Sequence, residues 1–171
     1  VLDDDETLAQ RVIDRDSEAD KLFAMITRHF RRALTNLREV EKLEYDRDEL
    51  FEYYYVSRTF ERVADHAEKI ARFTLDPEIS IPSPFDDRIE RLSSSSRHVV
   101  DTAADVILAD AGIEGAYTAL TERDDLTADL EELDRELYTH DDPAEAYVVG
   151  LLLDSVRRTA EYGGNVASIA I

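Results

Sequence analysis

Apolar residues recur every three or four positions along most of the chain, the spacing that predicts amphipathic α-helices. In the first half this pattern predicts a helix over residues 5–42 and another over 47–74. In the second half it predicts helices over 84–109, 113–139 and 143–170. Because short connections join consecutive helices, we expect antiparallel neighbours and an all-α protein built of helical bundles.

Capping residues support several of these boundaries. Asp46 precedes the second helix and Glu49 follows three residues later, which is the spacing of a capping box. Ser83-Pro84 places a polar N-cap and a proline at the start of the third helix. Asp142-Pro143 repeats that arrangement at the start of the fifth helix. We therefore expect the helices to begin close to these residues.

The two halves of the chain are similar to each other. Residues 58–71 align without gaps on 154–167, and residues 9–20 align without gaps on 116–127. A repeat of this kind is typical of two similar bundles placed side by side. The predicted organisation is a first repeat over 1–75, a linker over 76–83 and a second repeat over 84–171.

Composition limits the class of function. The 171 residues include 40 acidic and 20 basic side chains, giving a net charge of −20, which disfavours binding to nucleic acid or to an anionic membrane surface. The chain has no cysteine, which excludes disulfides, thiolate chemistry and cysteine-ligated metal sites. It shows neither an apolar run long enough for a membrane span nor a signal segment, so we expect a cytoplasmic protein.

Because the whole surface is acidic, a single cluster of acidic residues is weaker evidence for a functional site than it would be in a neutral protein. Only three of the twenty basic residues are lysines, and such a surplus of carboxylates with little lysine suits a protein kept soluble in concentrated salt. The composition therefore favours a halophilic source, with an acidic mesophile as the alternative. In either case many acidic side chains serve solvation alone.

Acidic residues nevertheless border the apolar stripes of the first two helices. Asp16 and Asp20 lie four residues apart in the first helix, and Glu61, Asp65 and Glu68 share one face of the second. Like charges at this spacing cost a helix a few tenths of a kcal/mol unless a cation lies among them. An arginine, a metal ion or water and salt would each satisfy this condition.

The segment Phe60-Glu-Arg-Val-Ala-Asp65, preceded by Asp16-x-x-x-Asp20, resembles the signature of the PhoU family of phosphate-uptake regulators. The resemblance covers essentially the whole chain and is more specific in the first half. It implies two three-helix bundles in tandem. Since only two helices precede the linker, the counterpart of the 84–109 helix is expected upstream of Val1 or from a partner chain. A fused DNA-binding domain upstream of Val1 also stays open.

The resemblance implies a metal site. Some members bind a multinuclear iron cluster on each bundle through paired acidic motifs, which correspond here to Asp16, Asp20, Glu61 and Asp65. Carboxylate oxygens suit hard cations; iron is expected from the resemblance, and zinc, manganese and magnesium remain alternatives. No glutamate stands three residues before a histidine, as ferritin-like di-iron sites require. We expect Glu68 to lie outside the site and His66 to be a surface residue.

The second repeat departs from the metal-binding pattern. The four corresponding positions hold Arg123, Thr127, Arg157 and Glu161. A guanidinium does not ligate a cation, so no metal is expected there. An ion pair between Arg157 and Glu161 is the preferred interpretation. The alternative is an anion site formed by Arg123 and Arg157.

For function, the resemblance implies a cytoplasmic, usually dimeric adaptor that restrains phosphate uptake by contacting the transporter ATPase or a sensor kinase. The sequence has no nucleophile–base pair and no glycine-rich phosphate loop, so we expect no enzymatic activity. One alternative is a metal-dependent, phosphatase-like hydrolase that uses the same acids. The other is a purely structural bundle with a halophilic acidic surface.

Overall fold

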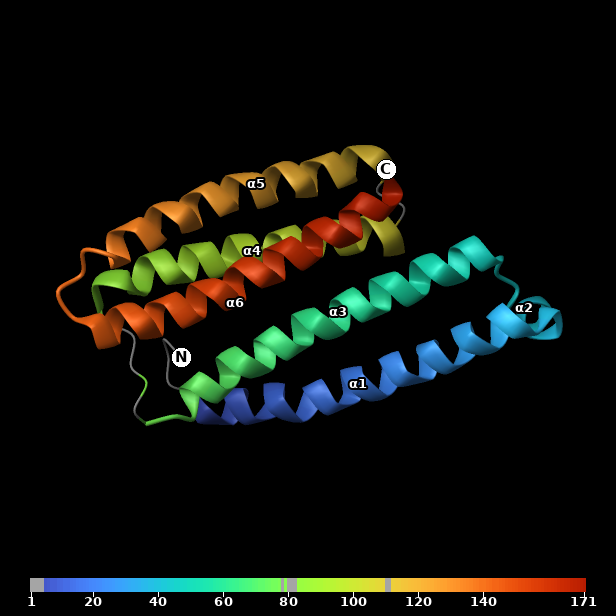
Figure 1. The fold of residues 1–171 in the computed structure, drawn as a ribbon, viewed down its shortest axis with the longest axis horizontal. Coiled ribbons are helices and arrows are strands. Elements are labelled where there is room, and N and C mark those ends of the chain that lie inside the picture. The colour runs from blue at the N-terminus through green and yellow to red at the C-terminus, as the bar shows by residue number, and fades with distance from the viewer. Residues whose placement is uncertain (1–4, 78, 80–82, 110–111) are drawn as a thin grey trace.

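The computed structural model describes residues 5–77, 79, 83–109 and 112–171, and over these it contains six α-helices, two 3-10 turns and no strand (Figure 1). The all-α prediction is confirmed. The helices are α1 (Glu6–Thr35), α2 (Leu37–Leu43), α3 (Arg47–Thr74), α4 (Asp86–Leu108), α5 (Gly112–Leu137) and α6 (Pro143–Ala167). The turns are η1 (Ser83–Phe85) and η2 (Ser168–Ala170). Part of the predicted linker, at 78 and 80–82, lies outside the described residues.

The helix predicted over 5–42 is in fact two helices. Asn36 leaves the helical conformation, with φ −140° and ψ 108°, so α1 ends at Thr35 and α2 begins at Leu37. The Asn36 side chain accepts a hydrogen bond of 3.1 Å from the backbone N–H of Arg38. Asparagine favours such caps because its side chain replaces a missing helical partner. The prediction is wrong here because apolar spacing continues across the cap.

The starts of α3 and α4 show how capping sets helix boundaries. Asp46 accepts from the backbone N–H of Glu49 at 2.9 Å, and the Glu49 carboxylate accepts from that of Asp46 at 2.8 Å, as the predicted capping box requires. In contrast, Ser83–Phe85 forms η1, and α4 begins only at Asp86 without a side-chain cap. The start predicted at Ser83-Pro84 is therefore a 3-10 turn.

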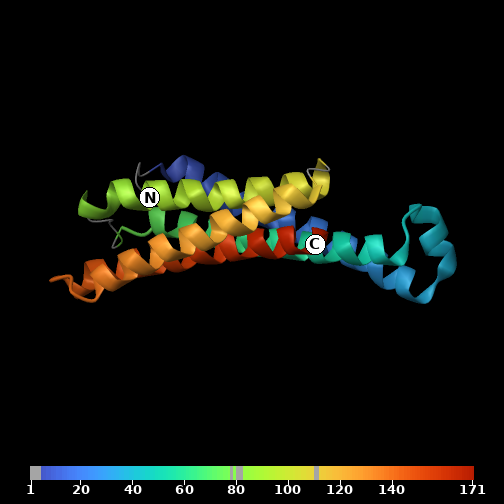
Figure 2. The same ribbon diagram turned by 90° about the horizontal axis from the view of Figure 1, so that it is seen from above.

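The helices form an antiparallel hairpin and a three-helix bundle. Helices α1 and α3 pack along each other, α4, α5 and α6 pack together, and α3 packs against α6. The hairpin extends past the end of the bundle, so that α2 lies at its far tip (Figures 1 and 2). No helix in the described part of the chain is long and apolar enough to cross a membrane.

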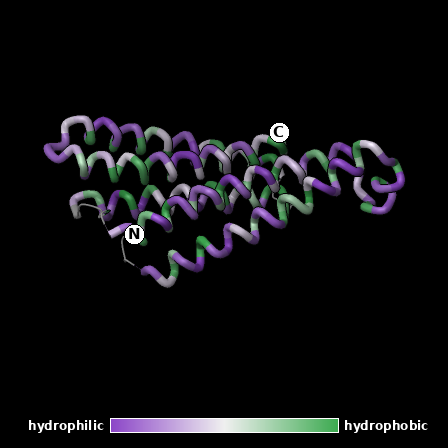
Figure 3. Tube along the Cα trace, turned by 60° about the horizontal axis from the view of Figure 1, so that its bottom comes forward, coloured by the Kyte–Doolittle hydropathy of each residue, from purple (hydrophilic) through white to green (hydrophobic). Residues whose placement is uncertain are grey.

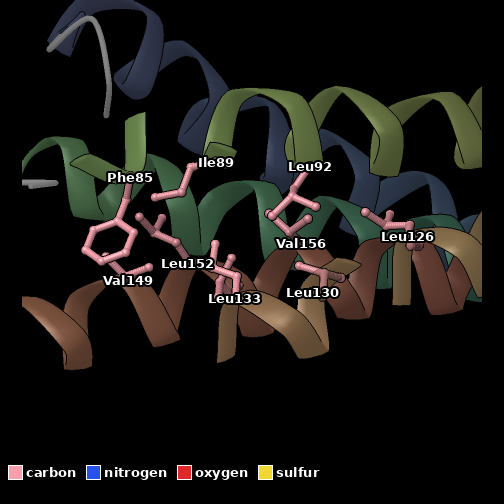
Figure 4. Packing of buried hydrophobic residues seen from close by; sticks show 11 residues of the cluster. Phe85, Ile89, Leu92, Leu126, Leu130, Leu133, Val149, Leu152 and Val156 are labelled. Atoms are coloured by element: carbon pink, nitrogen blue, oxygen red, sulfur yellow. The ribbon is translucent and has the colours of Figure 1, made fainter. Parts of the chain in front are cut away.

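The three-helix bundle has a core to which all three helices contribute (Figure 4). It includes Phe85 from η1, Ile89 and Leu92 from α4, Leu126, Leu130 and Leu133 from α5, and Val149, Leu152 and Val156 from α6. A second cluster attaches the hairpin, because Val56 of α3 packs with Ala103, Val106 and Val166. Burial of apolar surface, at about 25 cal/mol per Å², is the main term that stabilises both clusters.

Gly163 allows α6 to approach the backbone of α4. A Cβ atom at this position would lie 3.0 Å from Val99 Cγ1 and 3.2 Å from the backbone N and Cα of Val100. Such separations are shorter than ordinary carbon contacts, and close-packed interiors adjust to them only by moving backbone. Any side chain at 163 therefore separates the two helices.

We predict opposite effects for two glycine-to-alanine substitutions in α6. Gly163→Ala should lower the free energy of unfolding by about 1–3 kcal/mol, because α4 must shift. Gly150→Ala should raise it by about 0.5–1 kcal/mol, because alanine is the better helix former and nothing lies within 4 Å of the new Cβ. Urea unfolding followed by circular dichroism measures both. Effects of the same sign would contradict the packing described for Gly163.

Candidate metal centre

The two acidic pairs lie on neighbouring antiparallel helices, Asp16 and Asp20 on α1 and Glu61 and Asp65 on α3. Their charges act on one another across the contact. Asp20 and Asp65 both raise the pKa of Asp16, and both raise the pKa of Glu61. The structure thus brings the four residues singled out in the sequence to one side of the hairpin.

Asp16 and Glu61 are the two members of this cluster with unsatisfied oxygens. Burial is the largest cause of the raised pKa of each carboxyl group, and repulsion by neighbouring acids adds to it. Asp16 Oδ1 and Glu61 Oε2 are buried and accept no hydrogen bond. Arg62 Nε lies 3.7 Å from Glu61 Oε2, which is within reach of an ion pair but too long for a hydrogen bond.

Two arginines of α3 compensate other acids at the rim of the cluster. Arg62 Nη1 donates to Asp65 Oδ2 at 3.0 Å, and Arg72 Nη2 donates to Glu68 Oε1 at 2.5 Å. Both arginines are exposed, so solvent screening leaves these pairs with little effect on stability. Neither arginine therefore donates a hydrogen bond to the buried oxygens of Asp16 and Glu61.

The residue types fit a hard cation, although the side chains are not arranged around one. Within the described ranges, no three histidine or acidic side chains are grouped closely enough to hold a metal ion. The cluster nevertheless offers only oxygen donors, and two of these, on Asp16 and Glu61, are buried without a partner. Such donors match iron, manganese or magnesium better than a soft metal.

Two further features of the hairpin were not predicted from the sequence. Glu68, expected outside the site, raises the pKa of Asp16 more than any other charge does. Thr27 of α1 has a buried Oγ1 without a hydrogen-bond partner. Its counterpart in the repeat is Asp134, which binds Arg157, the counterpart of Glu61. Extending the repeat alignment by two turns therefore points to Thr27.

His66 lies against α6 and is not the surface residue expected. Its ring centroid is 5.8 Å from that of Tyr162, and its Nδ1 is buried without a hydrogen-bond partner. Burial lowers the pKa of His66, and the charge of Lys69 lowers it further. The spacing along α3 does not reveal this environment, because a different helix creates it.

The corresponding face of the second bundle is occupied by ion pairs. Arg157 donates to Asp134 of α5, whereas Glu161 accepts from Arg158 Nη1 at 2.9 Å. The predicted pair between Arg157 and Glu161 is therefore wrong. The competing partner Asp134 lies 23 residues away in the sequence, so helical spacing alone does not identify it.

Arg123, the counterpart of Asp16, occupies space that Gly164 leaves free. A Cβ on Gly164 would lie 2.7 Å from Arg123 Cδ and 2.9 Å from its Nη1. In the repeat alignment Gly164 corresponds to Glu68, just as Arg123 corresponds to Asp16. Asp16 and Glu68 are close enough to repel each other in the first repeat, and their counterparts are likewise in contact in the second. The guanidinium also donates to Asp124 at 2.5 Å. Both arginines of the suggested anion site are thus paired with carboxylates.

Comparison with known proteins identifies the first repeat. Residues 1–74 match the family model of the PhoU domain. This part of the chain is a PhoU domain. The PhoU match spans both acidic segments, 16–20 and 61–65, and the helices that carry them. A comparison with curated proteins finds no match to the chain. PhoU-domain proteins are regulators of phosphate transport, so the match agrees with the family resemblance.

We predict that Asp16→Asn stabilises the PhoU domain in the presence of a chelator. Because folding raises the pKa of Asp16, its contribution to stability is favourable below that pKa and is lost as the pH rises through it. Removing the charge should raise Tm by about 2–4 °C at pH 7, equivalent to about 1 kcal/mol. Differential scanning calorimetry measures this change.

Glu18→Gln provides the control, since Glu18 is an exposed acid on the same helix. It should leave Tm within about 1 °C of the unchanged protein. The difference between Asp16→Asn and the unchanged chain should shrink as the pH falls through the raised pKa. A lower Tm for Asp16→Asn at pH 7 would contradict the assigned cost of that charge.

Proposed function

We propose that this protein is a metal-binding adaptor that regulates phosphate uptake, with Asp16, Asp20, Glu61 and Asp65 as the metal-binding residues. The PhoU match carries the proposal, because residues 1–74 include both acidic pairs and relate the chain to regulators of phosphate transport. The mutual repulsion of these acids and their unsatisfied oxygens support the same assignment.

A bound cation would offset two costs of the cluster. It would reduce the repulsion among the carboxylates and give the buried oxygens of Asp16 and Glu61 a partner. We take iron as the proposed ion, with zinc, manganese and magnesium as alternatives. Its contribution would be positive charge that holds α1 against α3, which is a structural and not a catalytic role.

The proposed partners are the ATPase of a phosphate transporter or a sensor kinase. In this proposal the protein acts in the cytoplasm as a homodimer and catalyses no reaction. Membership of a regulator family supports an adaptor role over the hydrolase alternative. The acidic pairs lie on the hairpin, whose far end extends beyond the second bundle and offers surface for protein contact (Figure 2).

Affinity purification from phosphate-replete cells of the source organism tests the adaptor role. A tagged copy of the protein should co-purify with the transporter ATPase or a sensor kinase, identified by mass spectrometry. The double variant Asp16→Asn/Glu61→Gln should recover less of the partner if the metal stabilises the binding surface. Recovery of neither partner, from replete or from starved cells, would contradict the proposed function.

A further inference from the structure

Three arginines of α1 share one hollow on the surface of the hairpin. The hollow has a volume of about 420 Å³ and is lined by Ala24, Thr27, Arg28, Arg31, Arg32 and Thr35. The stretch 21–38 contains five lysine or arginine residues and no acidic one, although the whole chain has a net charge of −20. Figure 3 shows hydrophilic segments alternating with hydrophobic ones along α1. The hollow is therefore a local concentration of positive charge on the polar side of this helix.

No carboxylate neutralises these arginines within the part of the chain that the structure describes. Arg28, Arg31 and Arg32 are all exposed, and none of them forms an ion pair there. A hydrogen bond of 3.0 Å from Lys42 is the main cause of the lowered pKa of Glu39, to which the charge of Arg32 adds a smaller contribution. The three guanidinium groups thus keep their donors available.

Thr27 adds an unused hydroxyl group to the same hollow. Its Oγ1 is buried and has no hydrogen-bond partner. Elsewhere in the chain a helical threonine uses this group locally: Thr118, Thr121 and Thr127 each donate to the carbonyl four residues earlier, at 2.8–2.9 Å. A buried polar group without a partner is costly, so Thr27 Oγ1 indicates that a polar ligand completes the site.

The second repeat carries the opposite charge at the equivalent positions. Extending the repeat alignment along α5 makes Glu131, Asp134 and Arg135 the counterparts of Ala24, Thr27 and Arg28. Asp134 accepts from Arg157, and Arg135 Nε donates to the carbonyl of Glu131 at 3.0 Å. The acids that compensate arginines in the second repeat are therefore replaced by neutral residues in the first, and only there do the arginines lie without carboxylates.

The hollow lies away from the side of α1 that corresponds to the covered side of α5. Three α5 residues line a hollow together with α4, namely Asp129, Glu132 and Glu136. Their counterparts on α1 are Leu22, Met25 and His29. Helical spacing places these on a different face from Thr27 and Arg31. The counterpart of Arg31 is Tyr138, which is 88% exposed although α4 is present. A third helix packed on the first repeat in the same way would therefore leave the hollow open.

We propose that this hollow binds an oligophosphate, a small anion with two or more linked phosphate groups. The planar guanidinium group donates two parallel hydrogen bonds to a phosphate, and three such groups can hold more than one phosphate. The Thr27 hydroxyl supplies a further donor. Salt confines repulsion by the acids of the remaining surface to roughly 8–10 Å, so the local arginines dominate. The site is separate from the carboxylate cluster and goes beyond the proposed adaptor function.

Isothermal titration calorimetry with sodium tripolyphosphate and with orthophosphate tests the proposal on the 171-residue protein. The protein is first stripped of metal with a chelator and desalted, so that phosphate held by a metal ion is not counted. We expect one tripolyphosphate per chain, bound at least about tenfold more tightly than orthophosphate at the same salt concentration, because it reaches more guanidinium groups.

Equivalent positions of the two repeats provide matched variants. Arg28→Gln should weaken tripolyphosphate binding about tenfold, since it removes charged hydrogen bonds. Arg135→Gln should leave the binding unchanged, because this exposed arginine is the counterpart of Arg28 in the second repeat. Thr27→Val, which replaces the hydroxyl by a methyl group, should weaken binding several-fold. Circular dichroism checks that all three variants keep their helical content.

Four results would overturn the proposal. These are no binding of tripolyphosphate, equal affinity for the two anions, equal effects of Arg28→Gln and Arg135→Gln, and unchanged binding by Thr27→Val. The second would assign a site for a single phosphate, and the third a general effect of charge. None of them bears on co-purification with the transporter ATPase or a sensor kinase, so the adaptor function stands or fails separately.

Discussion

The contact between α1 and α3 combines attraction at one end with repulsion at the other. Towards the far end of the hairpin, Phe30 stacks on Tyr54 with a centroid distance of 4.7 Å, and Phe23 lies 5.8 Å from the same ring. Aromatic pairs of this kind contribute about 0.5–1.5 kcal/mol beyond their burial. Nearer the start of α1, Asp16 and Glu61 are held where burial and neighbouring acids disfavour their charges. Packing of the aromatic end thus maintains the acidic cluster.

The second bundle avoids this repulsion, because arginines occupy two of the positions that hold acids in the first repeat. Arg123 fits against α6 because Gly164 has no side chain, and Arg157 binds Asp134. The two repeats have therefore diverged: in the second the arginines at the corresponding positions are paired with carboxylates, while the first retains unsatisfied carboxylate oxygens.

Local signals in the sequence were sufficient for the helices and for the common face of the acids. The capping box at Asp46 and the spacing of Glu61 and Asp65 depend on contacts within one helix, which periodicity describes well. The break at Asn36 was missed because a side-chain cap competes with the helix inside a continuous apolar pattern. The partner of Arg157 and the environment of His66 were missed because other helices provide them.

The metal content of the purified protein tests the central claim, that the first repeat alone holds a metal ion at its carboxylates. Protein prepared without chelator, loaded with iron and desalted should retain iron, measured by plasma mass spectrometry. Asp16→Asn/Glu61→Gln should retain less than about a tenth as much, since even outer-shell changes cost 10–100-fold in affinity. Asp101→Asn/Glu131→Gln, which removes two exposed acids from the second bundle, should retain the unchanged amount. Equal iron in all three proteins, or none in the unchanged protein after loading with iron, zinc or manganese, would contradict the account.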